Sequence, residues 1–379
     1  MNDDALHSQF ARWQQRALIV GGATAVLALI GAFLDHAQFF RSYLIAWLFW
    51  SGLSFGALVI VMMQVLSGGL WGMGVRGLAT AAFRTIPAMA LLFIPVLLGL
   101  HDIFGWANGA NGETSGYHHK TQYLNAPFFT ARAILYFVAL GIVAALVRRW
   151  SLARGDAKAV PTRLTAISAS GLIVYVLCMN FASTDWIMSL DPKWYSTIFV
   201  EVVIMGQFLS ALALVTALLA VFTRGEAIPA KVFHDLGNLL LAFVIFWTYV
   251  SFSQFLIIWS GNLPKEIGWY LDRSRGGWQW AAVTLAVFQF LLPFLLLLSR
   301  AAKRNKQRLA PIALGIFLAN ILANFWLLAP TFHPSGFLVH WLDVAEFLAL
   351  GGFWFALFFY FLRQHPLLPQ QLMEVKSDA

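Results

Sequence analysis

A histidine next to an aspartate in a largely apolar segment is the first place where this sequence could support chemistry. The segment reads Leu-His101-Asp102-Ile-Phe-Gly-Trp106. Ionisable side chains cost a few kcal/mol near hydrocarbon unless they face protein or water. Imidazole titrates near neutral pH and an adjacent carboxylate takes up or passes on its proton, which suits a proton-releasing reaction such as quinol oxidation. The alternative is that the pair marks the interfacial end of a helix, with Trp106 in the aromatic belt.

The segment 181–197 is dense in tryptophan, acidic residues and helix-capping residues. Asp185 stands at the end of a long apolar run, at the same expected depth as Asp102, and is a second candidate for proton transfer. Asp191 precedes Pro192, which is typical of the N-cap and first residue of a short interfacial helix. Both interpretations of Asp191, a cap and a functional acid, stay open.

Three further ionisable residues lie in or beside apolar runs. Arg132 either snorkels outward or pairs with a carboxylate across the helix bundle. Glu201 lies near the start of its run, where the helix dipole favours an acid; the alternative is a buried carboxylate that carries protons. Asp235 follows His234 at the start of another run, and a helix start explains most of that pattern.

Other patterns have structural explanations or exclude whole classes of site. Asp343 and Glu346 have the N-cap and third-residue spacing of a capping box. The single cysteine, Cys178, excludes a cysteine-ligated iron–sulfur cluster and a C-x-x-C-H haem attachment. No histidine lies in the middle of an apolar run, as ligands of a b-type haem would, and no Cys/His spacing indicates a metal site. Redox carriers are therefore expected on other subunits or on a bound molecule.

The elements that position these residues are membrane helices. Of 379 residues, 60% are hydrophobic and 11% are charged, whereas soluble domains are about 45–50% apolar and about 25% charged. A membrane-spanning helix needs about 20 apolar residues. Ten such runs fill the chain and predict an all-α integral membrane protein, with 1–379 as a single domain: 17–34, 43–66, 85–104, 127–147, 164–183, 198–222, 236–260, 278–299, 309–329 and 344–362. The first run lacks a small-residue cleavage site and is expected to be a retained helix.

The basic residues predict the orientation of the helices. The net charge of +8 resides in loops between apolar runs, which argues against a nucleic-acid surface. If both termini are cytoplasmic, most of the 25 Lys and Arg lie on the cytoplasmic side, among them Arg76 and Arg84 in the loop between the second and third spans. His101, Asp102 and Asp185 then belong to the opposite rim.

At these motifs the sequence resembles a known family. The motifs are His101-Asp-Ile-Phe-Gly-Trp, His119-Lys-Thr-Gln-Tyr-Leu-Asn-Ala-Pro-Phe-Phe-Thr-Ala-Arg132 and the Asp185-Trp-Ile-Met-Ser-Leu-Asp191-Pro stretch. Over essentially the whole chain they resemble the second quinone-binding-type (F) membrane subunit of alternative complex III. That complex is a bacterial quinol:cytochrome c oxidoreductase, and the subunit belongs with the polysulfide-reductase-type ten-helix membrane proteins.

The resemblance implies two four-helix bundles, spans two to five and six to nine, flanked by spans one and ten. It implies the bacterial inner membrane, with lipid, a multihaem cytochrome c subunit, an iron–sulfur subunit and a homologous ten-helix membrane subunit as partners. It implies no covalently bound cofactor, and quinone or quinol as the bound molecule. His101, Asp102, Arg132 and Asp185 would face the first bundle, and His119 joins the quinone-binding or proton-transfer candidates.

Two competing functions remain. A secondary transporter would divide ten spans into two inverted halves of five with broken helices at the midplane. Only Pro87, Pro95 and Pro293 suggest such interruptions, without a clear pairing between the halves. The other competitor is a purely structural membrane scaffold.

Overall fold

The computed structural model describes residues 3–108, 122–154, 161–223, 228–364 and 367, and all regular structure in them is helical. The first half contains α1 (Asp3–Leu34), α2 (His36–Ser67), α3 (Leu70–Phe83), α4 (Ile86–Leu91), α5 (Ile94–Leu98), α6 (Leu100–Ile103), the 3-10 helix η1 (Gly105–Asn108), α7 (Ala126–Arg154), α8 (Thr162–Trp186) and the 3-10 helix η2 (Met188–Leu190). The second half contains α9 (Phe199–Phe222), α10 (Ala230–Gly261), α11 (Pro264–Arg273), α12 (Trp278–Leu285), the π-helix η3 (Ala286–Leu291), α13 (Leu292–Leu298), α14 (Arg300–Arg304), α15 (Lys306–Phe332) and α16 (Trp341–Leu362).

Ten candidate membrane spans in the described residues are long and apolar enough to cross a bilayer. Each overlaps one of the ten apolar runs, which confirms an all-α, ten-helix, multi-pass membrane protein. The third span differs from the expectation because it begins at Leu70, not near residue 85. Gly68 and Gly69 adopt φ values of 67° and 86°, a conformation that glycine reaches without strain, and they turn the chain directly after α2. Arg76 and Arg84, expected in a loop, therefore lie within α3 and at its C-cap.

The third span is broken into short helices, and α2 satisfies the backbone groups that the breaks release. Phe93 N–H bonds to Ala90 rather than Met89, and Val96 N–H bonds to Phe93 rather than Leu92. The released carbonyl of Met89 accepts from Trp47 Nε1 at 2.9 Å, and that of Leu92 accepts from the Tyr43 hydroxyl at 2.6 Å. Within a bilayer such carbonyls have no water to bind, so neighbouring helices must supply donors.

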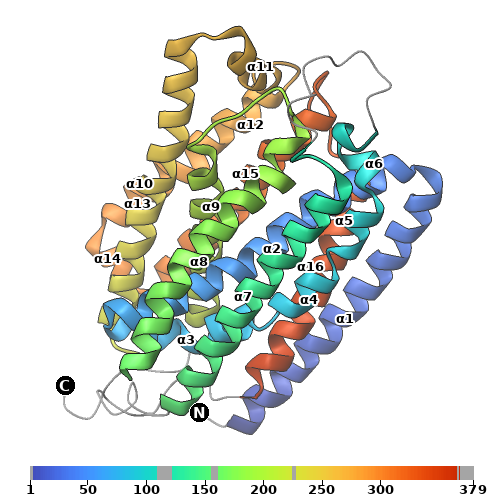
Figure 1. The fold of residues 1–379 in the computed structure, drawn as a ribbon. Helices are drawn as coiled ribbons and strands as arrows, with labels where there is room; N and C mark the ends of the chain where they lie inside the picture. Colours follow the sequence, from blue (N-terminus) through green and yellow to red (C-terminus); the bar gives the residue numbers. More distant parts are fainter. Residues whose placement is uncertain (1–2, 109–121, 155–160, 224–227, 365–366, 368–379) are drawn as a thin grey trace.

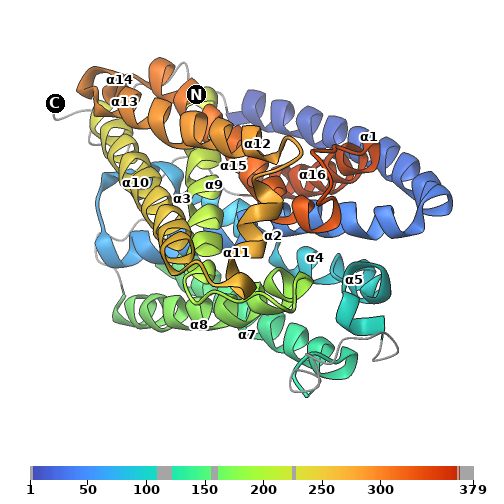
Figure 2. The same cartoon turned by 90° about the horizontal axis from the view of Figure 1, so that it is seen from above.

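The helices form two groups around α2, whose most hydrophobic window is completely buried. One group comprises α2, α3–α5, α7 and α8, and the other comprises α9, α10, α12–α13 and α15. Figure 2 shows α7 and α8 on one side of the molecule and α10 and α13 on another, while α1 and α16 lie together at the edge. The arrangement agrees with two four-helix bundles flanked by the first and last spans. In Figure 1, α1 begins and α16 ends at the same end of the molecule.

The close approach of α1 and α16 depends on glycine. A Cβ atom at Gly352 would meet backbone atoms of Gly21 and Ala17, which cannot rotate away as a side chain can. Small residues of this kind let membrane helices pack backbone to backbone.

We expect Gly352→Ala to lower the free energy of unfolding by about 1–3 kcal/mol, because the added methyl group forces the two helices apart. Denaturant-induced unfolding in detergent, followed by tryptophan fluorescence, measures the change. Gly22→Ala is the matched control, since a Cβ at Gly22 meets nothing within 4 Å. Equal stabilities of the two variants would contradict the proposed contact.

Candidate functional site

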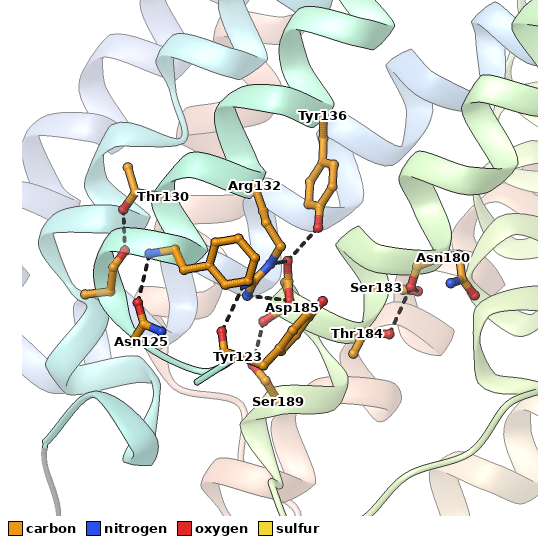
Figure 3. Close-up of polar contacts among 12 residues, drawn as sticks. Tyr123, Asn125, Thr130, Arg132, Tyr136, Asn180, Ser183, Thr184, Asp185 and Ser189 are labelled. Atoms are coloured by element: carbon orange, nitrogen blue, oxygen red, sulfur yellow. Dashed lines mark hydrogen bonds and ion pairs between the residues drawn. The ribbon is translucent and has the colours of Figure 1, made fainter. Parts of the chain in front are cut away.

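Arg132 and Asp185 form a buried ion pair where α7 begins and α8 ends. The two helices pack against each other, so the second turn of α7 faces the last turn of α8 (Figure 3). Arg132 Nε donates to Asp185 Oδ2 at 2.8 Å, and Arg132 Nη2 donates to Asp185 Oδ1 at 2.9 Å. The residues are only 7% and 0% exposed. Arg132 therefore pairs with a carboxylate, in the bidentate geometry that gives guanidinium–carboxylate pairs their strength and direction.

Tyr136 completes the hydrogen bonding of the Asp185 carboxylate. It lies four residues after Arg132, on the same face of α7. Its hydroxyl donates to Asp185 Oδ2 at 2.8 Å, as Figure 3 shows. These three hydrogen bonds to the carboxylate all come from α7. The buried charge is fully paired, as the cost of desolvating it requires.

Tyr123 covers the ion pair from the segment that leads into α7. Its carbonyl accepts from Arg132 Nη1 at 2.9 Å, and its ring centroid lies 3.8 Å from the guanidinium carbon. Burial and the charge of Asp185 raise the pKa of Tyr123 to about 12, so the hydroxyl is protonated at neutral pH. The hydroxyl oxygen is buried close to the Asp185 carboxylate and the Tyr136 hydroxyl, but it makes no hydrogen bond of standard geometry among the described residues. The site therefore has one weakly held hydrogen-bond donor beside its ion pair.

Trp106 links the first motif to the ion pair. Ser189 Oγ donates to the Asp185 carbonyl at 2.5 Å and accepts from Trp106 Nε1 at 3.2 Å. The two segments singled out in the sequence therefore meet. They do so through Trp106, whose indole was expected only to mark the membrane interface.

His101 and Asp102 form a separate polar group. The His101 side chain is exposed, whereas Asp102 Oδ2 lies 3.1 Å from Nδ1 of His36, at the start of α2. Arg41 Nε also donates to the Asp102 carbonyl at 3.2 Å. Consecutive residues of a helix point about 100° apart, so these two side chains do not share a partner. Of the four residues expected to face one pocket, Arg132 and Asp185 pair with each other, Asp102 pairs with His36, and the His101 side chain is exposed. Both pairs lie at the α6 end of the molecule (Figure 1).

The remaining candidates lie apart from this site. Glu201 is half-buried in the first turn of α9. Asp191 follows η2 and accepts from Lys193 N–H at 3.1 Å; no helix begins at Pro192, so the N-cap interpretation is wrong. Asp235 pairs with His234 Nδ1 at 3.5 Å in the first turns of α10, at the opposite end of the molecule (Figure 1). His119 lies outside the described residues.

The capping box at the start of α16 is shifted from its expected place. His340 is the N-cap and Asp343 is the third residue of the box, so Asp343 is not the cap and Glu346 is not its partner. The sequence pattern could not separate the two registers because imidazole is an uncommon cap. Glu346 is instead buried at 3% exposure.

Within the described residues no group of three or more His, Cys, Asp or Glu side chains could hold a metal ion.

The sequence analysis did not identify Tyr136 and Tyr123 as site residues. The four-residue spacing from Arg132, which places both side chains on one face of a helix, could have identified Tyr136. No sequence pattern could have identified Tyr123. Comparison of the chain with protein-family models and with curated proteins finds no match.

Proposed function

We propose that this chain is a membrane subunit of a quinol:cytochrome c oxidoreductase of the alternative complex III type. It would lie in the bacterial inner membrane with both termini in the cytoplasm. The redox centres would reside on a multihaem cytochrome c subunit and an iron–sulfur subunit, beside a homologous ten-helix subunit. The resemblance of the motifs suggests this assignment, and the buried Arg132–Asp185 pair is the structural observation that supports it.

The ion pair supports a role in proton transfer. Ionisable residues inside membrane helices are expensive, and they usually mark proton or substrate pathways. Asp185 accepts hydrogen bonds from the Tyr136 hydroxyl and from Nε and Nη2 of Arg132, so the Tyr136 proton is already aligned with a carboxylate oxygen that can take it. Quinol oxidation must release protons together with electrons. In this proposal the Tyr136 hydroxyl passes its proton to the Asp185 carboxylate as its oxygen takes one from the quinol. The Asp185 carboxyl then releases that proton to water at the rim, and the Tyr123 hydroxyl donates a hydrogen bond to a quinone oxygen.

Tyr136→Phe tests the relay with little change of shape. In the complex purified from native membranes, we expect quinol:cytochrome c turnover to fall about a hundredfold, at the lower end of the usual effect of losing a proton-transfer group. Tyr195→Phe is the control, because Tyr195 is 60% exposed on the α8–α9 connection. Unchanged turnover in Tyr136→Phe would exclude the proton relay. Purification of the chain without haem c subunits would exclude its assignment to the respiratory complex.

One observation favours a secondary transporter as a second candidate. The third span is broken into α3, α4 and α5, and the eighth contains the π-helix η3 before Pro293. These spans occupy the same position in two halves of five, where transporters place discontinuous helices. A chain that purifies alone and moves a substrate into proteoliposomes would favour this candidate over the respiratory one.

A further inference from the structure

A large cavity lies in the second group of helices, away from the Arg132–Asp185 site. It has a volume of about 1180 Å³ and is walled by α9, α10, α11, α12, η3 and α15, with α2 behind them. Pockets for small molecules usually measure about 300–1,000 Å³. Most of the lining side chains are apolar or aromatic, which suits an occupant with a long hydrocarbon body.

The cavity is accessible from the surface that faces the bilayer. Phe252 and Trp259 of α10 and Val283 of α12 line it, and they are 58%, 63% and 51% exposed. These helices are membrane spans, so apolar residues exposed on them face hydrocarbon. A molecule in the bilayer can therefore reach the cavity from the side.

A buried arginine stands at one end of the cavity. Arg273, the last residue of α11, lines the cavity and is 3% exposed. Figure 1 shows α11 lying across the ends of α10 and α12, outside the membrane spans. Its Nη1 donates to the Trp269 carbonyl at 2.9 Å and its Nη2 donates to the Leu327 carbonyl at 2.7 Å. These contacts hold the guanidinium in place without neutralising it.

The guanidinium of Arg273 lies 3.4 Å from the ring centroid of Trp269, and no described carboxylate neutralises its charge. Among the described residues no carboxylate lies within 4.0 Å of it, and Asp272 and Asp191 act only at longer range. Burial lowers the pKa of Arg273 to about 9, so the group still carries its charge at neutral pH. Its Nε is buried without a hydrogen-bond partner in the described residues. An unpaired buried charge of this kind is destabilising unless a ligand supplies the counter-charge.

A second unused donor lies in the same cavity. Trp326 Nε1 is buried and has no partner among the described residues, and Trp326 also lines the cavity. Its ring lies 5.9 Å from the guanidinium carbon of Arg273. One positive charge and two free N–H groups therefore converge at the α11 end, above a long apolar chamber. That combination recognises an anionic head attached to hydrocarbon chains.

We propose that this cavity binds an anionic phospholipid from the surrounding bilayer. The phosphate lies against Arg273 and Trp326, and an acyl chain fills the space between α9, α10 and α15. A zwitterionic lipid offers the same phosphate but adds a cationic group, which the charge of Arg273 repels. A single-chain fatty acid would leave much of the volume empty. The site is independent of the proposed respiratory function.

Lipid retention by the intact protein tests the proposal. The purified chain, in its native complex where it has one, is delipidated in mild detergent and titrated with dioleoyl phosphatidylglycerol, dioleoyl phosphatidylcholine or oleate. Native mass spectrometry counts the bound molecules. We expect phosphatidylglycerol to bind about tenfold more tightly than phosphatidylcholine, because only phosphatidylglycerol brings a net negative charge to Arg273. Tighter binding of oleate, or no preference for phosphatidylglycerol, would overturn the proposal.

Two variants, Arg273→Gln and Gly206→Leu, test whether the lipid binds in this cavity, and Arg275→Gln is the control. Arg273→Gln should abolish the preference for phosphatidylglycerol, whereas Arg275→Gln, which removes an exposed charge two residues away, should retain it. Gly206→Leu fills the cavity without touching Arg273: a Cβ at Gly206 meets only Trp247 Nε1, at 3.8 Å. It should weaken phosphatidylglycerol binding while Arg273 is intact, so the test does not depend on the folding of one variant. Equal behaviour of the two arginine variants, or full binding by Gly206→Leu, contradicts the assignment.

Discussion

Replacement of Asp185 by leucine is expected to lower the free energy of unfolding by about 3–5 kcal/mol, because it leaves the Arg132 guanidinium buried without a counter-charge. The partners are too deeply enclosed for water to replace the carboxylate, since Arg132 is 7% exposed and Asp185 is 0% exposed. Denaturant-induced unfolding of the detergent-solubilised protein, followed by tryptophan fluorescence, measures the loss. Arg132→Met should lower the free energy of unfolding by a similar amount, because it leaves the Asp185 carboxylate buried without a counter-charge.

The double variant Arg132→Met/Asp185→Leu separates a broken ion pair from lost packing. Replacing both charges with apolar groups removes the penalty that either single change creates, so the double variant should be more stable than each single variant. Asp191→Leu, in a partly exposed turn at the same end of α8, is the control; it removes only the hydrogen bond from Lys193 N–H and should lower stability by about 1 kcal/mol or less. Additive losses in the double variant would show that the two side chains stabilise the protein independently.

The number and type of the helices could be predicted because a bilayer imposes a simple rule. A spanning segment needs about 20 apolar residues, and this chain repeats such runs throughout. The third span shows where the rule fails. Its start depends on the turn at Gly68 and Gly69, and its breaks are tolerated only because Tyr43 and Trp47 bind the released carbonyls. Those contacts depend on the rotation of α2, which hydropathy does not report.

The candidate site could be predicted only in part, for a similar reason. Arg132 and Asp185 are conspicuous as charges in apolar runs, and pairing across the bundle was one of two expectations. Whether they meet depends on which faces of α7 and α8 pack together. His101 is as conspicuous in the sequence, yet its side chain is exposed while that of Asp102 contacts His36. Local spacing identifies residues that need a partner, but tertiary packing decides which partner they find.

Asp343 makes the contacts that fasten the start of α16 to α2. Its Oδ1 accepts from the Ser42 hydroxyl at 2.6 Å, and its Oδ2 accepts from the His340 N–H at 2.8 Å. The side chain of Gln38 approaches the same Oδ1 at 3.4 Å. Asp343 is 8% exposed and Ser42 is 0% exposed, so removal of the carboxylate leaves buried donors unpaired. Hydrogen bonds to a charged group are worth about 1.5–3 kcal/mol, and a helix cap adds about 1 kcal/mol.

Asp343→Ala should therefore lower the free energy of unfolding by about 3 kcal/mol, measured by the same unfolding assay. Asp35→Ala is the matched control, because Asp35 caps α2 at the same end, accepts from Gln38 N–H at 3.0 Å and is exposed. Its loss should be about 1 kcal/mol. Ser42→Ala in the Asp343→Ala background should cost about 1 kcal/mol more, because the Ser42 hydroxyl still accepts from Gln38 Nε2, at 3.0 Å, after Asp343 is removed. Equal losses from the two aspartate variants would mean that Asp343 acts as an ordinary cap. The attachment of α16 to α2 would then depend on contacts such as that of Trp50 Nε1 with the Phe347 carbonyl, at 3.0 Å.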